Sequence, residues 1–218
     1  MLAVALFAAQ ARAEVEVPVT VGGLRTQAGV LSLIELRDRN LVRQGWDVSC
    51  GAAALSTVLT HHFDTPYSEA TIAVSILANT DPARVRERGG FSLLDLKRFA
   101  EAVGFEAEGY AGLTTDDLVD SGLPVILPVR IRDLDHFVVF RGRVAGKVLI
   151  GDPAFGNLTL SERQFAGMWS SGIGFFVEPA DGNRPDWNPA DAVALTVPDL
   201  GFVYRFGARI DPVPATRR

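Results

Sequence analysis

The residues of this chain that could carry out covalent chemistry are one cysteine and three polar side chains. Cys50 is the only cysteine among 218 residues. It is a candidate nucleophile, His136 is the candidate general base, and Asp152 could orient the imidazole. Gln44 could aim its side-chain amide at a developing oxyanion, helped by the backbone N–H of Cys50. Together these four residues predict a cysteine acyl-transfer site.

Each of these residues also has an ordinary structural interpretation. A single cysteine is most often an inert buried residue. His136 could be a hydrogen-bonded core histidine, and an Asp-Pro pair such as Asp152-Pro153 often starts a turn. The order of the candidates along the chain, each at the boundary of an expected element, favours the catalytic interpretation.

Cys50 lies where a loop gives way to a run of small and apolar residues. Leu55 and Leu59 recur at helical spacing, which predicts a buried helix that begins near Ser49 or Cys50. The unpaired backbone N–H groups and the dipole at the start of this helix would point at the sulfur. Both effects favour thiolate over thiol.

His136 and Asp152 are expected at the ends of neighbouring strands. His136 begins an apolar run at 137–143, and Asp152 follows the next expected strand at 147–150. Antiparallel pairing of the two strands would place the carboxylate beside the imidazole. A helix packed across this sheet could then present its cysteine to the histidine.

The order of expected elements predicts an α+β fold, with helices first and an antiparallel sheet afterwards. The segment 31–40 fits either a strand or a short helix. We expect the C-terminal residues 179–218 to be extended and to add an edge strand at 201–210. Further helices are expected at 68–79, 93–103, 114–121 and 161–168, and further strands at 15–19, 105–110, 123–131 and 174–178.

Composition limits the partners and indicates a compartment. The net charge is −5 without a basic stripe, which argues against nucleic acid. The apolar run at 2–9 is shorter than the ~20 residues that cross a bilayer. It precedes Ala11-Arg12-Ala13, the pattern of a signal-peptide cleavage site, although no Lys or Arg precedes the run. We therefore expect a periplasmic or secreted protein, in which an unpaired cysteine is retained for use.

No metal or other cofactor is expected. His61-His62 with Asp64 could suggest metal ligands, but adjacent histidines point to different faces, so a solvated turn is favoured.

The spacing Gln44–(five residues)–Cys50-Gly51-x-Ala53-x-Leu55, followed by His136-Phe137 and Asp152-Pro153, resembles the bacteriocin-processing cysteine peptidases that cut double-glycine leaders. The resemblance covers about residues 40–178 and implies a papain-like fold. It also implies that Cys50 is the nucleophile, His136 the general base, Asp152 the orienting residue and Gln44 the oxyanion donor.

Two departures from that family change the expected setting. The residue before the cysteine is usually acidic in the family, whereas Ser49 stands here. The usual peptidase belongs to a membrane transporter, whereas the sequence predicts no membrane span. The resemblance thus implies a standalone, exported relative, and some such relatives accompany secretion systems for functional amyloid fibres. The expected partner is a peptide or protein substrate of such a system, cut after small residues.

The expected organisation is a signal peptide at 1–13, an N-terminal extension at 14–40, a papain-like peptidase domain at 41–178 and a C-terminal extension at 179–218. Two other functions stay open. One is a peptidase-like module that binds a secretion substrate without cutting it, although Cys50 and His136 count against this. The other is a thiol transferase or cell-wall amidase.

Overall fold

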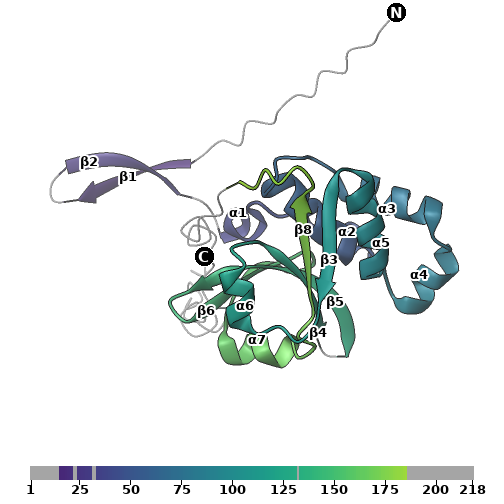
Figure 1. Ribbon diagram of the computed structural model, residues 1–218. Coiled ribbons are helices and arrows are strands. Elements are labelled where there is room, and N and C mark those ends of the chain that lie inside the picture. The colour runs from purple at the N-terminus through teal and green to yellow at the C-terminus, as the bar shows by residue number, and fades with distance from the viewer. Residues whose placement is uncertain (1–14, 22–23, 31–32, 132, 186–218) are drawn as a thin grey trace, which may run out of the picture.

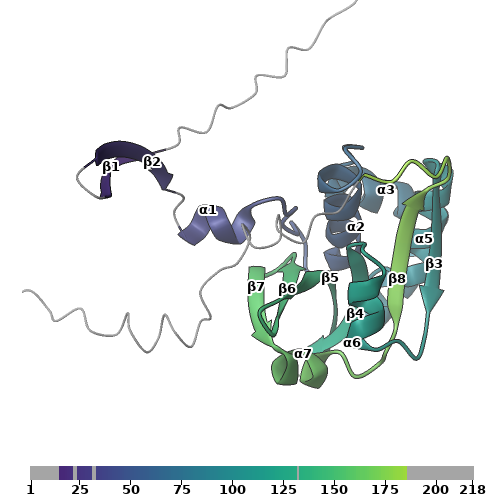
Figure 2. The same cartoon turned by 60° about the vertical axis from the view of Figure 1, so that its left-hand side comes forward.

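The computed structural model describes residues 15–21, 24–30, 33–131 and 133–185 (Figure 1). The expected signal peptide at 1–13 and the expected strand at 201–210 lie outside these residues. The expected strand at 15–19 is confirmed as β1 (Val15–Val21), which pairs antiparallel with β2 (Leu24–Val30). This two-stranded sheet stands apart from the rest of the fold in Figures 1 and 2.

The main body contains a six-stranded sheet in the order β3-β8-β4-β5-β6-β7, with every neighbouring pair antiparallel. The most C-terminal strand, β8, is inserted between β3 and β4, where Phe175 pairs with Ile126. The strands are β3 (Phe105–Tyr110), β4 (Val125–Ile131), β5 (Leu134–Val144), β6 (Lys147–Asp152), β7 (Gly156–Ser161) and β8 (Gly174–Pro179).

Local capping chemistry sets the helix boundaries. Ser92, Thr114 and Ser161 each accept a hydrogen bond from the backbone three residues later, and each forms a capping box with the acid or amide at that position. The segment 31–40, left open between strand and helix, contains a short helix. The helices are α1 (Leu33–Asp38), α2 (Cys50–His61), α3 (Glu69–Asn79), α4 (Pro82–Arg88), α5 (Leu93–Ala102), α6 (Thr115–Asp120) and α7 (Glu162–Met168).

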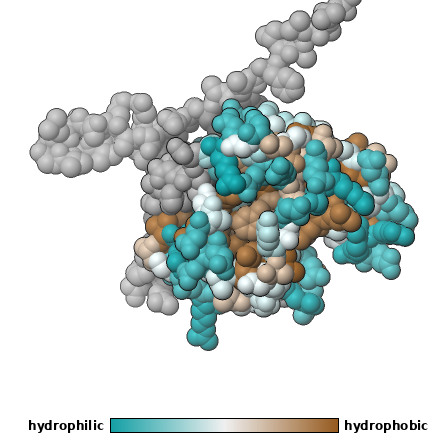
Figure 3. All heavy atoms as spheres, viewed as in Figure 1, coloured by the Kyte–Doolittle hydropathy of each residue, from teal (hydrophilic) through white to brown (hydrophobic). Residues whose placement is uncertain are grey.

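Two apolar clusters cover the two faces of the sheet. Helices α2, α3 and α5 pack on one face, and α6 and α7 on the other (Figure 2). Side chains of β4 alternate between the clusters, with Ile126 in the first and Val125 and Leu127 in the second. Figure 3 shows apolar side chains gathered near the middle of one face, with hydrophilic ones around them. The expected α+β class is confirmed.

Three elements were missing from the sequence prediction: β2, α4 and β7. Helix α4 has no apolar stripe, since Val85 is its one buried residue, but Asp81 caps its start and Gly89 ends it in a left-handed conformation. Strand β7 forms a hairpin with β6, and its first residue, Gly156, has φ +94°. A side chain at Gly156 would also meet the Arg37 carbonyl at 2.9 Å. The sequence analysis predicted no strand between 151 and the helix at 161–168, so β7 was missed.

Candidate active site

Cys50 is the first residue of α2, as the sequence predicts. Ser49 is the N-cap, but its side chain makes no capping hydrogen bond and no acidic residue lies in the first turn. The positive end of the helix dipole therefore lies at the residue that carries the sulfur. Cys50 is 6% exposed, and the helix behind it is buried through Leu59.

His136 and Asp152 meet across neighbouring strands. Val139 of β5 pairs with Gly151 of β6, which places His136 and Asp152 on the same face of the sheet. The Nε2 atom of His136 lies 2.9 Å from Oδ1 of Asp152. Asp152 is the last residue of β6 rather than the residue after the strand, because its pairing with Gly156 extends the ladder.

The Asp152 carboxylate is fixed by its own turn. It is fully buried, and Oδ1 also accepts hydrogen bonds from the backbone N–H of Ala154 at 2.7 Å and of Phe155 at 3.1 Å. These bonds hold the carboxylate in one orientation toward the imidazole.

The environment of His136 favours the protonated ring. Burial by itself lowers the pKa of His136, but hydrogen bonds to Asp152 and Cys50, with the negative charges of both, raise it to about 9. The cysteine and the aspartate thus act on the same imidazole ring. At neutral pH it carries a proton that can be delivered to a leaving group.

Gln44 lies beside the same turn. Its backbone N–H donates to the Pro153 carbonyl at 3.0 Å. Its side-chain Nε2 donates to the Trp46 carbonyl at 3.2 Å, within the loop that leads to Cys50, while Oε1 is buried without a hydrogen-bond partner. The structure thus ties Gln44 to both the aspartate turn and the cysteine loop.

Two arginines that the sequence analysis missed, Arg37 and Arg43, hold this turn in place together with Gln44. The segment 37–44 runs along the turn after Asp152 and donates to three successive carbonyls, which leaves the turn little freedom to move. No local signal could reveal these bonds, because more than 100 residues separate the partners. The donors are Gln44 N to Pro153 O, Arg43 Nη2 to Ala154 O, and Arg37 Nη2 and Nε to Phe155 O at 2.7 and 3.2 Å.

Gly51 allows α2 to approach the sheet closely. A Cβ at this position would lie 3.1 Å from Cδ2 of Phe137 and 3.3 Å from Cδ1 of Leu96. Phe137 is the neighbour of His136 on β5, so this contact sets the distance between the cysteine helix and the histidine strand.

We therefore expect Gly51→Ala to reduce kcat by about tenfold, since small displacements of reacting groups are costly. The unfolding free energy should change by less than about 1 kcal/mol, because the better helix propensity of alanine offsets the crowding. Both quantities can be measured by steady-state kinetics and thermal unfolding. Gly167→Ala in α7 is the matched control, since an added Cβ there meets nothing within 4 Å. Equal kcat values for the two variants would contradict this role of Gly51.

The two histidines considered as metal ligands lie at the opposite end of α2 from Cys50. His61 is the last residue of α2 rather than part of a turn, and His62 is its C-cap. The residues that the structure describes contain no cluster of three or more potential metal ligands. Within the same residues, no helix has the length and apolarity to cross a membrane.

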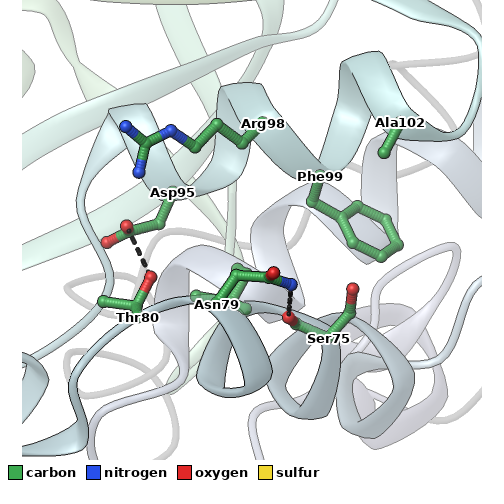
Figure 4. A pocket seen from close by; sticks show the side chains of 8 residues that line it. Ser75, Asn79, Thr80, Asp95, Arg98, Phe99 and Ala102 are labelled. Carbon is green, nitrogen blue, oxygen red and sulfur yellow. Dashed lines mark hydrogen bonds between the residues drawn. The ribbon is translucent and has the colours of Figure 1, made fainter.

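A cavity of about 440 Å³ lies between α3 and α5, away from the candidate site (Figure 4). Two of its polar side chains are engaged locally: Thr80 donates to Asp95 at 3.1 Å, and Asn79 donates to the Ser75 carbonyl at 3.0 Å. None of the four candidate catalytic residues lines it.

A cysteine at the head of a buried helix, facing a histidine carried by an antiparallel sheet, defines the papain-like class of cysteine peptidases. Comparison with known proteins places the chain within this class. Residues 38–182 match the peptidase C39 family, and the chain belongs to that family. It is a cysteine peptidase, a hydrolase that acts on a peptide substrate.

Similar proteins share this class. The chain is 41% identical over 156 residues to the "Probable functional amyloid protease FapD" of Pseudomonas fluorescens. The aligned residues make up 72% of this chain and 68% of the relative. Two solved structures also match, each over 64% of this chain. One is the peptidase domain of Streptococcus ComA, a bifunctional ABC transporter involved in quorum sensing, with TM-score 0.54, 28% identity and 97% of that domain covered. The other is a double glycine motif protease from an AMS/PCAT transporter in complex with the leader peptide, with TM-score 0.53, 26% identity and 90% covered.

Proposed function

We propose that this chain is an exported endopeptidase that cuts an extended peptide after small residues, using Cys50 as nucleophile, His136 as general acid and base, and Asp152 as orienting residue. The observation that carries the proposal is the His136 ring, whose Nε2 lies 2.9 Å from Oδ1 of Asp152 and whose pKa is raised by both Asp152 and Cys50. Gln44 and the backbone N–H of Cys50 form the oxyanion hole.

The reaction has two steps. The Cys50 thiolate attacks the carbonyl carbon of the scissile bond, forming a C–S bond and an oxyanion. As the C–N bond breaks, the His136 imidazolium gives its proton to the leaving amine, and a thioester remains. His136 then removes a proton from water, which attacks the thioester, releases the new carboxyl end and regenerates Cys50.

The substrate class follows from the relatives. A structural neighbour is a double glycine motif protease, and a relative is named as a functional amyloid protease. The substrate proposed here is an extended segment of a secreted or fibre-forming protein, cut after Gly, Ala or Ser. The location is the periplasm or outside the cell, supported by the pattern of residues 2–13 and the unpaired cysteine.

The test is cleavage of a library of extended peptides, including segments of functional-amyloid subunits, with products identified by mass spectrometry. The full chain should cut after small residues, and prior treatment with iodoacetamide at pH 6 should abolish cleavage by alkylating the thiolate. Undiminished cleavage after complete alkylation of Cys50 would show that Cys50 is not the nucleophile. Binding of the peptides without cleavage would instead favour a non-cleaving module.

The pH dependence of cleavage provides a second test. His136 must be protonated to release the amine, and its pKa is about 9, so kcat/KM should fall as the pH rises through about 9. Asp152→Asn removes a negative charge that favours the imidazolium, so the pKa of His136 should fall. The alkaline limb, the fall of kcat/KM at high pH, should therefore move to lower pH. The control is Asp135→Asn, next to His136 but exposed, which should leave the limb in place. An unmoved limb in Asp152→Asn would exclude this role of the carboxylate.

A further inference from the structure

One buried carboxylate outside the proposed catalytic set contacts both ends of the loop between Gln44 and Cys50. Glu69 is the first residue of α3 and is 8% exposed. Its Oε1 and Oε2 accept from the backbone N–H of Gly45 at 2.8 and 3.0 Å. The Ser49 hydroxyl forms a short hydrogen bond with Oε1. Gly45 follows Gln44, and Ser49 precedes Cys50.

The other hydrogen bonds of the loop indicate that the Ser49 hydroxyl is the donor in its bond to Glu69. The Ser49 hydroxyl has one proton and two acceptors within reach, the Trp46 carbonyl at 2.7 Å and Glu69. The carboxylate is the stronger acceptor. The Trp46 carbonyl also accepts hydrogen bonds from two other donors, Gln44 Nε2 at 3.2 Å and the backbone N–H of Ser49 at 3.3 Å. The Ser49 proton is therefore available to Glu69.

The placement of Glu69 is unusual for a helix-terminal acid. An acid in the first turn of α3 already interacts favourably with the helix dipole, and an exposed side chain would suffice for that. Glu69 is instead buried and turned toward the loop. The packing is close, since a Cβ on Gly45 would lie 3.2 Å from Oε2.

We propose that Glu69 is a positioning residue that sets the geometry of the oxyanion hole, by fixing the loop that carries Gln44 at one end and Cys50 at the other. This rests on the oxyanion role of Gln44 in the proposed function. The hydrogen bonds of Glu69 go to Gly45 and Ser49, the neighbours of Gln44 and Cys50. Its effect on rate therefore passes through Gln44 and the backbone N–H of Cys50, and it should have little influence on reactions that form no oxyanion.

Two reactions of Cys50 separate this role from a purely structural one. Acylation by p-nitrophenyl acetate forms a tetrahedral oxyanion before p-nitrophenolate leaves, so it uses the oxyanion hole. In alkylation by iodoacetamide the sulfur attacks the methylene carbon and iodide leaves in the same step, so no oxyanion forms and the oxyanion hole is not used. The ratio of the two rate constants, compared with the same ratio for free cysteine, measures oxyanion stabilisation without a natural substrate.

The ratio is measured on the full chain and on Gln44→Ala, Glu69→Ala, Glu69→Gln and the double variant Gln44→Ala/Glu69→Ala. Ser68→Ala is the matched control. Ser68 caps the same helix by accepting from the Thr71 N–H at 3.0 Å, so its loss weakens α3 without touching the loop. Thermal unfolding shows which variants fold. If Glu69→Ala does not fold, Glu69→Gln is used in its place to measure the ratio.

We expect Gln44→Ala to lower the ratio by about 100-fold and Glu69→Ala by about 10-fold or more, with alkylation changed by less than about threefold. The double variant should have a ratio no lower than that of Gln44→Ala, because Gln44 and Glu69 act on the same oxyanion hole. Ser68→Ala should retain the ratio of the unmodified chain.

Different results overturn different statements. If Gln44→Ala lowers the ratio but the folded Glu69 variants match Ser68→Ala, the inference about Glu69 fails and the proposed function stands. Losses that multiply in the double variant would also overturn it. If the unmodified chain has the ratio of free cysteine, or Gln44→Ala changes nothing, the oxyanion role of Gln44 fails, and the inference fails with it.

Discussion

Replacing Cys50 with alanine should reduce peptide cleavage to the background rate, a loss on the order of 10⁴-fold or more, while the fold is retained. The sulfur is the one atom that can form the thioester, and water held in the same site is a much weaker nucleophile. Cys50 is buried among small residues at the start of α2, so alanine fits the same space. Product analysis by mass spectrometry measures the loss, and circular dichroism checks the helix content.

His136→Ala provides an independent comparison. Nucleophile and base act as one unit, so the double variant with Cys50→Ala should be no slower than either single variant. Cleavage by Cys50→Ala well above background, at the same peptide bonds as the unmodified chain, would mean that another residue supplies the nucleophile.

Replacing Gln44 with alanine should lower kcat by about 100-fold or more, with a much smaller change in KM. An oxyanion donor strengthens its hydrogen bond as charge develops, so its loss is felt in the transition state rather than in substrate binding. The backbone of Gln44 is held by the Pro153 carbonyl at 3.0 Å, so truncation of the side chain should leave the loop in place. Steady-state kinetics with a cleaved library peptide measures both constants.

Two further glutamine variants sharpen this prediction. Gln44→Glu keeps the shape but presents acceptors in place of an N–H donor, so it should lose at least as much activity as alanine. Gln164→Ala is the matched control, because Gln164 closes the capping box of α7 and is not part of the site. A fall confined to KM in Gln44→Ala would assign this residue to substrate binding.

The candidate site could be predicted to a large extent because its signals are local. The change at Cys50 from a polar loop to an apolar helical run predicts both the start of α2 and the place of the sulfur. The apolar runs at 123–131 and 137–143, bounded by turn residues, predict the strands of the sheet, and antiparallel neighbours bring His136 to Asp152. The capping residue Ser92 and the corresponding residues of α6 and α7 define helix starts within a few residues of sequence.

What the sequence alone determined is thus the identity of the chemical groups and the elements that carry them, because capping and periodicity act between residues a few positions apart. Only the tertiary structure decided that β8 lies between β3 and β4, that Arg37 and Arg43 hold the turn after Asp152, and that Glu69 reaches the loop before Cys50. These contacts join residues far apart in sequence. They depend on how whole surfaces fit when the core closes, and no local propensity encodes that fit.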